Sequence, residues 1–150
     1  MWTYTLWYYA QMDWFFAPSQ STAHELQGKG INPAKIKLMP RGIDTVRFHP
    51  EKRNGYFEHT HAVQDGYKIL YVGRVSKEKN LHILAGMFKQ LSRVINNVTL
   101  VIVGDGPYLA ELQNTLRGTP CIFTGSLEGD ELADVYASCD IFVFPSTTDT

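Results

Sequence analysis

The chain has 150 residues, of which 44% are hydrophobic and 19% are charged, and its 14 Lys and Arg are balanced by 15 Asp and Glu. A chain of this length buries roughly 70% of its unfolded surface, so it needs neither a metal ion nor a disulfide to fold. The formal net charge of -1 excludes a polybasic surface for nucleic acid, and two cysteines are too few for a disulfide framework, which favours a reducing compartment such as the cytoplasm.

The N-terminal stretch from Trp2 to Phe16 is crowded with aromatic side chains. It has no cationic segment or cleavage site, and Asp13 interrupts it well before about 20 apolar residues, so it predicts neither a signal peptide nor a membrane span. The first interpretation is an aromatic helix packed on a core, and the second is a helix that lies on a membrane surface. Such a start resembles the interior of a domain more than its beginning.

Short elements are predicted in the first fifty residues. Strand-like runs at 14–17 and 36–39 flank a helix that begins around Ser19 and ends near Gln27, and the residues from Pro40 onward break the pattern. The stretch 51–66 is polar and rich in turn formers. We therefore expect a small first unit with a hinge, a polar linker and a second domain, at 1–50, 51–66 and 67–150.

From residue 68 to 144, short apolar runs alternate with helical periods, which is typical of βα units on a parallel sheet. The expected strands are 68–72, 98–103, 121–124 and 141–144. The apolar residues expected to face inward are Leu81, Leu84, Phe88, Leu91 and Ile95 in the first helix, Leu109, Leu112 and Leu116 in the second, and Leu132, Val135, Tyr136 and Cys139 in the third. The pattern predicts an α/β fold, a Rossmann-like parallel sheet with flanking helices. Because the last strand has no covering helix after it, we expect a chain truncated at both ends.

Ligands of open parallel sheets bind beyond the carboxyl ends of the strands, which directs attention to the residues that follow each strand. Gly73 has no Cβ, so a ligand can approach its backbone, and Arg74 offers a planar fork for phosphate oxygens. Lys79 precedes the N-terminus of the next helix, for which Asn80 is a candidate N-cap. Together they predict a diphosphate site; the alternative is that Arg74 and Lys79 are solvated loop charges.

The turn Gly104-Asp105-Gly106 resembles half of a dinucleotide fingerprint, but Leu109 stands where the third glycine belongs. A tight turn with a close ligand approach is the favoured interpretation. Asp105 either touches the ligand or caps the next helix, and capping is favoured. His59 and His61 have no third ligand nearby in the sequence, so no metal site is expected.

Several motifs in order resemble one enzyme family. They are Gly73-Arg74, Glu78-Lys79-Asn80, Val103-Gly104-Asp105-Gly106-Pro107, Phe123-Thr124-Gly125, Leu132 to Tyr136, Cys139 to Val143 and Phe144-Pro145-Ser146. In this order and at this spacing they resemble the C-terminal domain of the family 4 retaining glycosyltransferases, also known as glycosyl transferases group 1. Phe16-Ala17-Pro18-Ser19, Arg41-Gly42-Ile43-Asp44 and Phe48-His49-Pro50 resemble the end of that family's N-terminal domain and the hinge after it.

The resemblance implies a partial GT-B fold, in which two Rossmann-like domains face a cleft and the C-terminal one holds the sugar nucleotide. It assigns the donor diphosphate to Arg74 and Lys79, and it puts Asp149 where the family has the first glutamate of its paired-acid motif. The backbone of Gly125, Ser126 and Leu127 would lie near the base. We include Gly73, Gly104 and Asp105 in the same donor site.

The implied reaction is transfer of a hexosyl group from a UDP-sugar or GDP-sugar to a lipid or saccharide acceptor, with retention of configuration. The resemblance implies no metal and no further cofactor, and it is compatible with peripheral membrane contact; the fragment alone is expected to be inactive. The sequence leaves open a dinucleotide-binding oxidoreductase domain, which would want a small residue in place of Leu109 and an acid in place of Thr124. It also leaves open a non-catalytic α/β interaction module. The base, the sugar and the acceptor are not decided.

Overall fold

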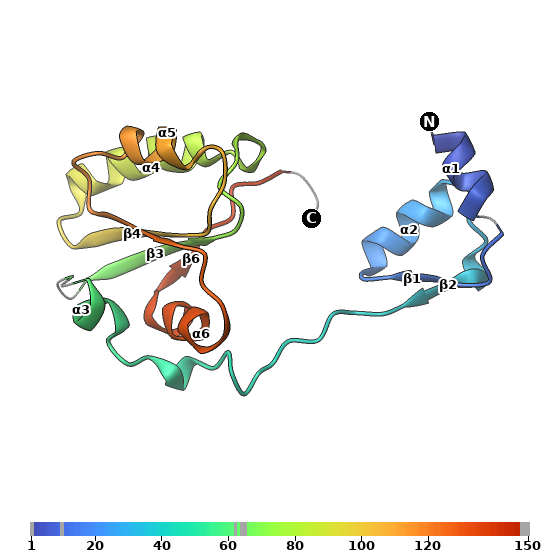
Figure 1. The fold of residues 1–150 in the computed structure, drawn as a ribbon, viewed down its shortest axis with the longest axis horizontal. Helices are drawn as coiled ribbons and strands as arrows, with labels where there is room; N and C mark the ends of the chain where they lie inside the picture. Colours follow the sequence, from blue (N-terminus) through green and yellow to red (C-terminus); the bar gives the residue numbers. More distant parts are fainter. Residues whose placement is uncertain (1, 10, 62, 64–65, 148–150) are drawn as a thin grey trace. The chain divides into compact units, whose positions relative to one another are not determined.

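The structure is a computed structural model that describes residues 2–9, 11–61, 63 and 66–147. Contacts within the chain divide it into two compact units, residues 1–43 and 44–150 (Figure 1). Asp149, one of the expected site residues, lies outside the described residues.

The first unit contains α1 (Trp2–Tyr9), β1 (Phe15–Ala17), α2 (Gln20–Gly28), the short 3-10 helix η1 (Pro33–Lys35) and β2 (Ile36–Leu38). β1 and β2 pair in parallel, which confirms both predicted strands. α2 begins where predicted because the Ser19 hydroxyl accepts a hydrogen bond from the Thr22 N–H at 3.1 Å.

The aromatic stretch forms the expected helix α1, but the rings whose burial the structure describes on this helix are exposed. Tyr4 is 73% exposed and Trp7 is 62% exposed, and Tyr8 and Tyr9 are also exposed. The physical reason lies in the size of the first unit, whose two-stranded sheet is too small to cover these rings.

The second unit is built on a parallel sheet in the order β5-β4-β3-β6. Its strands are β3 (Tyr67–Val72), β4 (Val98–Val103), β5 (Cys121–Gly125) and β6 (Ile141–Phe142), and the helices between them are η3 (Lys77–Lys79), α4 (Leu81–Val94), α5 (Leu109–Thr115) and α6 (Gly129–Ser138). This confirms the predicted α/β class and the alternation of strands and helices. α4 and α5 cover one face of the sheet, and α6 covers the other (Figure 1).

Successive residues of β3 and β4 alternate between the two faces, which explains why both strands are mostly apolar, apart from Lys68 and Thr99. Tyr71 and Ile102 pack in the cluster beneath α4 and α5, whereas Leu70, Val101 and Val103 pack in the cluster beneath α6. The two strands are in parallel register from Tyr67 opposite Val98 to Val72 opposite Val103. The carboxyl ends of the central strands therefore meet at one edge of the sheet.

Two details of the C-terminal part differ from the expectation. Tyr136 is 38% exposed rather than inward, because the buried face of α6 centres on Val135 and the next residue points away from it. The Tyr136 ring instead contacts Phe48 and Phe142. β6 ends at Phe142 rather than at residue 144, since Pro145 has no N–H to continue the ladder.

The segment 44–61 opens the second unit, and its short helices contact α6. Asp44 Oδ1 accepts hydrogen bonds from the N–H groups of Val46 and Arg47, at 3.2 and 3.0 Å, which forms a turn. The segment 51–66, expected to be a polar linker, contains η2 (Pro50–Lys52) in part and all of α3 (Tyr56–Thr60). Phe57 of α3 is fully buried in the cluster beneath α6.

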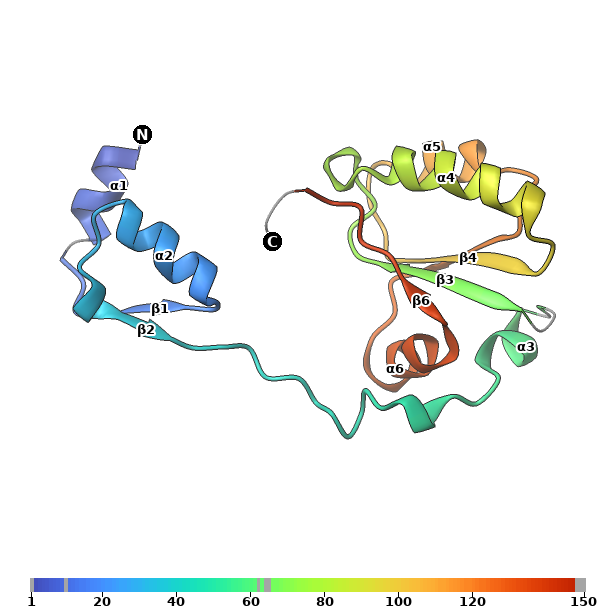
Figure 2. The same ribbon diagram turned by 180° about the vertical axis from the view of Figure 1, so that it is seen from behind.

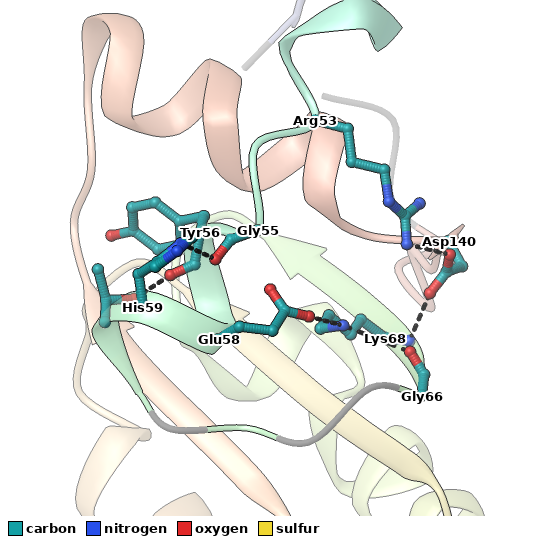
Figure 3. Close-up of polar contacts among 9 residues, drawn as sticks. Arg53, Gly55, Tyr56, Glu58, His59, Gly66, Lys68 and Asp140 are labelled. Carbon is teal, nitrogen blue, oxygen red and sulfur yellow. Dashed lines mark hydrogen bonds and ion pairs between the residues drawn. The ribbon is translucent and has the colours of Figure 1, made fainter.

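The buried Lys68 links the segment 44–61 to the amino end of the sheet through Glu58 (Figure 3). The Lys68 side chain is 1% exposed, and its Nζ donates to Glu58 Oε1 at 2.8 Å and to the Gly66 carbonyl at 3.4 Å. The Lys68 N–H donates to Asp140 Oδ2 at 2.8 Å, and Arg53 Nη2 pairs with Asp140 Oδ1 at 3.0 Å. The ammonium of Lys68 thus depends on Glu58 for its counter-charge.

Replacing Glu58 with Gln should lower the free energy of unfolding by about 1–3 kcal/mol, the cost of weakening a charged hydrogen bond to a buried partner. The loss stays below the about 3–5 kcal/mol of a fully buried pair, because the Glu58 side chain is 37% exposed. Urea denaturation of the intact chain measures it. Glu51→Gln is the matched control, since the Glu51 side chain is 89% exposed and should leave the midpoint unchanged. Equal midpoints for both variants and the original chain would contradict the role of Glu58.

The same pair makes stability depend on pH. The hydrogen bond from Lys68 lowers the pKa of Glu58 from its ordinary value of 4.5. A depressed carboxyl pKa contributes stability above the unfolded value, and this contribution is lost as the pH falls through the folded value. The difference in midpoint between the original chain and Glu58→Gln should therefore be constant above pH 5 and shrink below pH 4.5. A constant difference down to about pH 2 would contradict it.

Candidate functional site

The loops that follow β3, β4 and β5 are hydrogen-bonded to one another at the carboxyl edge of the sheet. The Gly73 N–H donates to the Val103 carbonyl at 3.0 Å, and the Gly104 N–H donates to the Gly125 carbonyl at 2.7 Å. The Val75 N–H donates to the Asp105 carbonyl at 2.9 Å. The structure therefore brings together Gly73, Gly104, Asp105 and Gly125, as the sequence predicted for the ends of parallel strands.

The packing of the first loop requires the glycines of the second loop. A Cβ on Gly104 would lie 2.0 Å from the Gly73 carbonyl oxygen, and a Cβ on Gly106 would lie 2.3 Å from the Val75 carbonyl oxygen. Both glycines also have positive φ, 127° and 158°. The backbone of the neighbouring loop makes a close approach at Gly104, and the expected approach of a ligand at this turn stays a prediction.

Asp105 does not cap the following helix, contrary to the favoured interpretation. Its Oδ1 accepts a hydrogen bond from the N–H of Gly106 at 2.6 Å, whereas α5 begins only at Leu109, with Tyr108 in the capping position. Two turn residues, Pro107 and Tyr108, separate the carboxylate from the helix. Asp105 remains exposed at the edge where a ligand is expected.

Arg74 is exposed, and Lys79 is partly buried at the end of η3. Both charges act on the same carboxylate. The pKa of Glu78 is lowered first by the neighbouring Ser76 hydroxyl, then by its own backbone N–H, and further by the charges of Arg74 and Lys79. Ser76 is buried and close enough to Glu78 to affect its pKa. Within the described residues, however, the Ser76 Oγ forms no well-aligned hydrogen bond. The two cations thus share one electrostatic neighbourhood.

Asn80 occupies the predicted position at the start of α4, but its side chain does not cap the helix. The residue is left-handed, with φ 55°, and its Nδ2 donates to the Pro145 carbonyl at 3.3 Å. Asn tolerates this conformation better than most residues. The Asn80 side chain therefore links the segment after β6 to the start of α4, next to Lys79.

The third loop contributes backbone to the same edge. Gly125 ends β5 with φ 76°, Ser126 is exposed, and Leu127 packs against the cluster beneath α6. The side chain of Leu127 therefore belongs to the core. The assignment of this backbone to the base, like the role of each cation, stays a prediction.

Within the described residues, no group of three or more His, Cys, Asp and Glu side chains could hold a metal ion. His59 Nδ1 lies 2.7 Å from the Gly55 carbonyl oxygen, and His61 Nδ1 lies 2.6 Å from the Thr60 hydroxyl. Burial raises the pKa of Cys121 and of Cys139 to about 12, which keeps both thiols protonated. In the described part of the chain, no helix is both long and apolar enough to cross a membrane.

Comparison with known proteins identifies the family. The model for glycosyl transferases group 1 matches residues 66–150, and the model for glycosyltransferase family 4 matches residues 1–47. The chain belongs to the glycosyl transferases group 1 family. It is 41% identical to a GDP-mannose-dependent alpha-mannosyltransferase of Corynebacterium glutamicum, over 89% of this chain and 30% of that protein.

Further relatives of the group 1 chain are similar over most of its length. The sulfoquinovosyl transferase SQD2 of Arabidopsis thaliana is 31% identical over 100% of this chain and 29% of its own. The crystal structure of Anabaena Alr3699/HepE in complex with UDP and glucose has the same fold, with a TM-score of 0.80 and 19% identity over 98% of this chain and 42% of that one. The chain therefore spans about 30% of the length of the curated relatives it matches.

Family membership decides between the alternatives that the sequence left open. The match to the group 1 model favours a glycosyltransferase domain over a dinucleotide-binding oxidoreductase domain. It also explains why the turn after β4 lacks the third small residue of a dinucleotide fingerprint at Leu109.

Sequence reasoning did not single out two aromatic residues that lie beside Arg74 and Lys79, namely Tyr71 and Phe144. The Tyr71 hydroxyl donates to the Arg74 carbonyl at 2.9 Å, and the Tyr71 ring stacks on Phe144. The available signal was a tyrosine among the aliphatic residues of a buried strand, because a buried hydroxyl needs a hydrogen-bond partner.

The contact between the first two loops can be tested at Gly104. Gly104→Ala should lower the free energy of unfolding by more than about 3 kcal/mol, because a backbone carbonyl occupies the place of the new methyl group. Gly118→Ala is the matched control: Gly118 also has positive φ, but nothing lies within 4 Å of its Cβ position. The control should lose only about 1–2 kcal/mol from backbone strain. Equal losses in urea denaturation would argue against loop packing as the reason for Gly104.

Proposed function

We propose that the chain forms the donor-binding part of a glycosyltransferase that transfers a hexosyl group from a nucleotide-diphosphate sugar to a lipid or saccharide acceptor. The observation that carries the proposal is the position of two cations at the carboxyl edge of the sheet: Arg74 follows β3, and Lys79 ends η3 just before α4. Relatives named as mannosyl and sulfoquinovosyl transferases support the reaction class. The complex of Alr3699/HepE with UDP-glucose supports a nucleotide-sugar donor.

The chemistry follows from where charge develops. When the bond between the anomeric carbon and the phosphate oxygen breaks, its electron pair stays on the leaving diphosphate. The Arg74 guanidinium and the Lys79 ammonium would stabilise this charge more strongly than that of the intact donor, which lowers the barrier. We propose that these cations act without a metal ion or a further cofactor, and that the transfer retains configuration.

The remaining site residues complete the proposed donor site. The backbone from Gly125 to Leu127 would contact the base, and Asp149 would approach the hydroxyls of the donor sugar. Gly73, Gly104 and Asp105 would border the diphosphate from the two neighbouring loops. The reduced cysteines favour a cytoplasmic enzyme, and peripheral membrane contact would serve a lipid acceptor.

Titration of the chain with UDP, GDP and NAD, followed by amide NMR shifts, tests the proposal. UDP or GDP should shift the amide signals of Gly73, Arg74 and Gly125, whereas NAD should not. Shifts with NAD alone, or no response to either UDP or GDP, would overturn the proposed donor site.

Single substitutions test the two cations. Arg74→Ala and Lys79→Ala should each weaken binding of the preferred nucleotide by about tenfold or more, since each removes a charge-assisted hydrogen bond of about 1.5–3 kcal/mol. Lys77→Ala is the matched control, because Lys77 is 74% exposed and pairs with Glu111 at 3.0 Å. The control should change the dissociation constant by less than about threefold. Three variants with the affinity of the original chain would refute the role of the cations.

A further inference from the structure

From the contacts around the candidate donor site, we infer that Tyr71 and Phe144 are positioning residues, which hold the Arg74 loop and the Lys79 ammonium ready for a nucleoside diphosphate. The inference rests on the proposed function, because it concerns how the two proposed phosphate ligands are held. Neither aromatic residue needs to touch the ligand. Each acts through one of the two cations.

Tyr71 controls the path of the chain after β3. Its side chain is 0% exposed, and its hydroxyl donates to the Arg74 carbonyl at 2.9 Å. Burial, and to a lesser degree the charge of Glu78, raises the pKa of Tyr71, so the hydroxyl keeps the proton that it donates. A Cβ on Gly73 would lie 3.1 Å from this hydroxyl, so the glycine leaves room for it. The hydroxyl and the glycine together fix the turn that presents Arg74.

Phe144 links this turn to the second cation. Its ring stacks on Tyr71 with a centroid distance of 6.2 Å and an interplanar angle of 11°, and Lys79 Nζ lies 5.6 Å from the centre of the Phe144 ring. This distance is within the range of a cation–π contact. Asn80 Nδ2 donates to the next carbonyl, that of Pro145. The segment after β6 therefore runs beside the loop that precedes α4 (Figure 2).

Packing alone does not account for these contacts. The Tyr71 ring fills the core, but a phenylalanine would fill it equally well, so the hydroxyl serves the Arg74 carbonyl. Phe144 is 44% exposed, so much of its ring faces solvent rather than the core. Arginine and lysine side chains lose much conformational freedom when they are fixed on a ligand. The Phe144 ring holds the Lys79 side chain in advance, and the Tyr71 hydroxyl fixes the backbone from which Arg74 extends. Both contacts lower the cost of ordering the site without a new ligand contact.

The first experiment compares Tyr71→Phe with the control Tyr67→Phe, which lies on the same strand and is 63% exposed. UDP and GDP dissociation constants are measured by NMR titration of the intact chain, with a thermal melt of each variant. Tyr71→Phe should weaken binding of the preferred nucleotide by about three- to tenfold, the effect of one hydrogen bond, while Tyr67→Phe should bind like the original chain. The melts check that both variants remain folded at the titration temperature.

The second experiment tests whether Phe144 acts through Lys79. Phe144→Leu should weaken binding by about two- to fivefold, as expected for a cation–π contact at a partly exposed site, and Phe144→Trp should restore it. In a Lys79→Ala background, Phe144→Leu should have no further effect, because the ammonium that the ring holds is gone. Phe16→Leu is the control, because Phe16 is 60% exposed and lies on β1 in the first unit; it should bind like the original chain.

The outcomes separate this inference from the proposed function. If the original chain binds UDP or GDP and the Tyr71 and Phe144 variants bind equally well, the positioning role is wrong and the donor site stands. An undiminished effect of Phe144→Leu in the Lys79→Ala background would also overturn it. If the original chain binds neither nucleotide, the donor site itself is wrong, and the inference falls with it.

Discussion

The carboxyl edge of the second unit depends on one steric constraint, the contact between the loop after β3 and the loop after β4. The carbonyl oxygen of Gly73 lies 2.0 Å from the place where Gly104 would carry a Cβ, so only glycine allows the two loops to meet. This contact sets where Arg74 leaves the sheet, because Gly73 immediately precedes it. The hydrogen bond from Gly104 to Gly125 extends the same arrangement to β5.

The charged side chains at the two ends of the sheet differ in whether they form ion pairs. At the amino end, Lys68 and Asp140 meet charged partners, and these pairs stabilise the fold. At the carboxyl end, neither Arg74 nor Lys79 forms an ion pair within the described residues, and both act on Glu78 only at longer range. Charges left without a close partner at the ligand edge are those that a bound anion can recruit. This contrast is the physical basis of the proposed donor site.

The pattern of apolar residues was enough to predict the sheet. β3 and β4 are buried on both faces, and in the helices between the strands an apolar residue recurs every three or four positions. The rule for parallel sheets was enough to predict which loops converge. Sequence could not show why Gly104 is a glycine, since the reason is a loop about thirty residues away in the chain. It could not show the partner of the Tyr71 hydroxyl, nor that Asp105 stops short of α5, because these depend on turn geometry. The buried Phe57 was missed for a similar reason: a single apolar residue in a polar stretch has no period.

The burial of Phe57 and the pairing of Glu58 with Lys68 have a consequence for where the second unit begins. The match to the group 1 model starts at residue 66. The Phe57 ring that completes the core beneath α6, and the Glu58 carboxylate that pairs with the buried Lys68 ammonium, both precede it. A unit that began at residue 66 would lack Phe57 and Glu58. The core beneath α6 would then contain a cavity, and the buried ammonium of Lys68 would lose its counter-charge. The structural border lies near Asp44, some twenty residues before the match to the group 1 model begins.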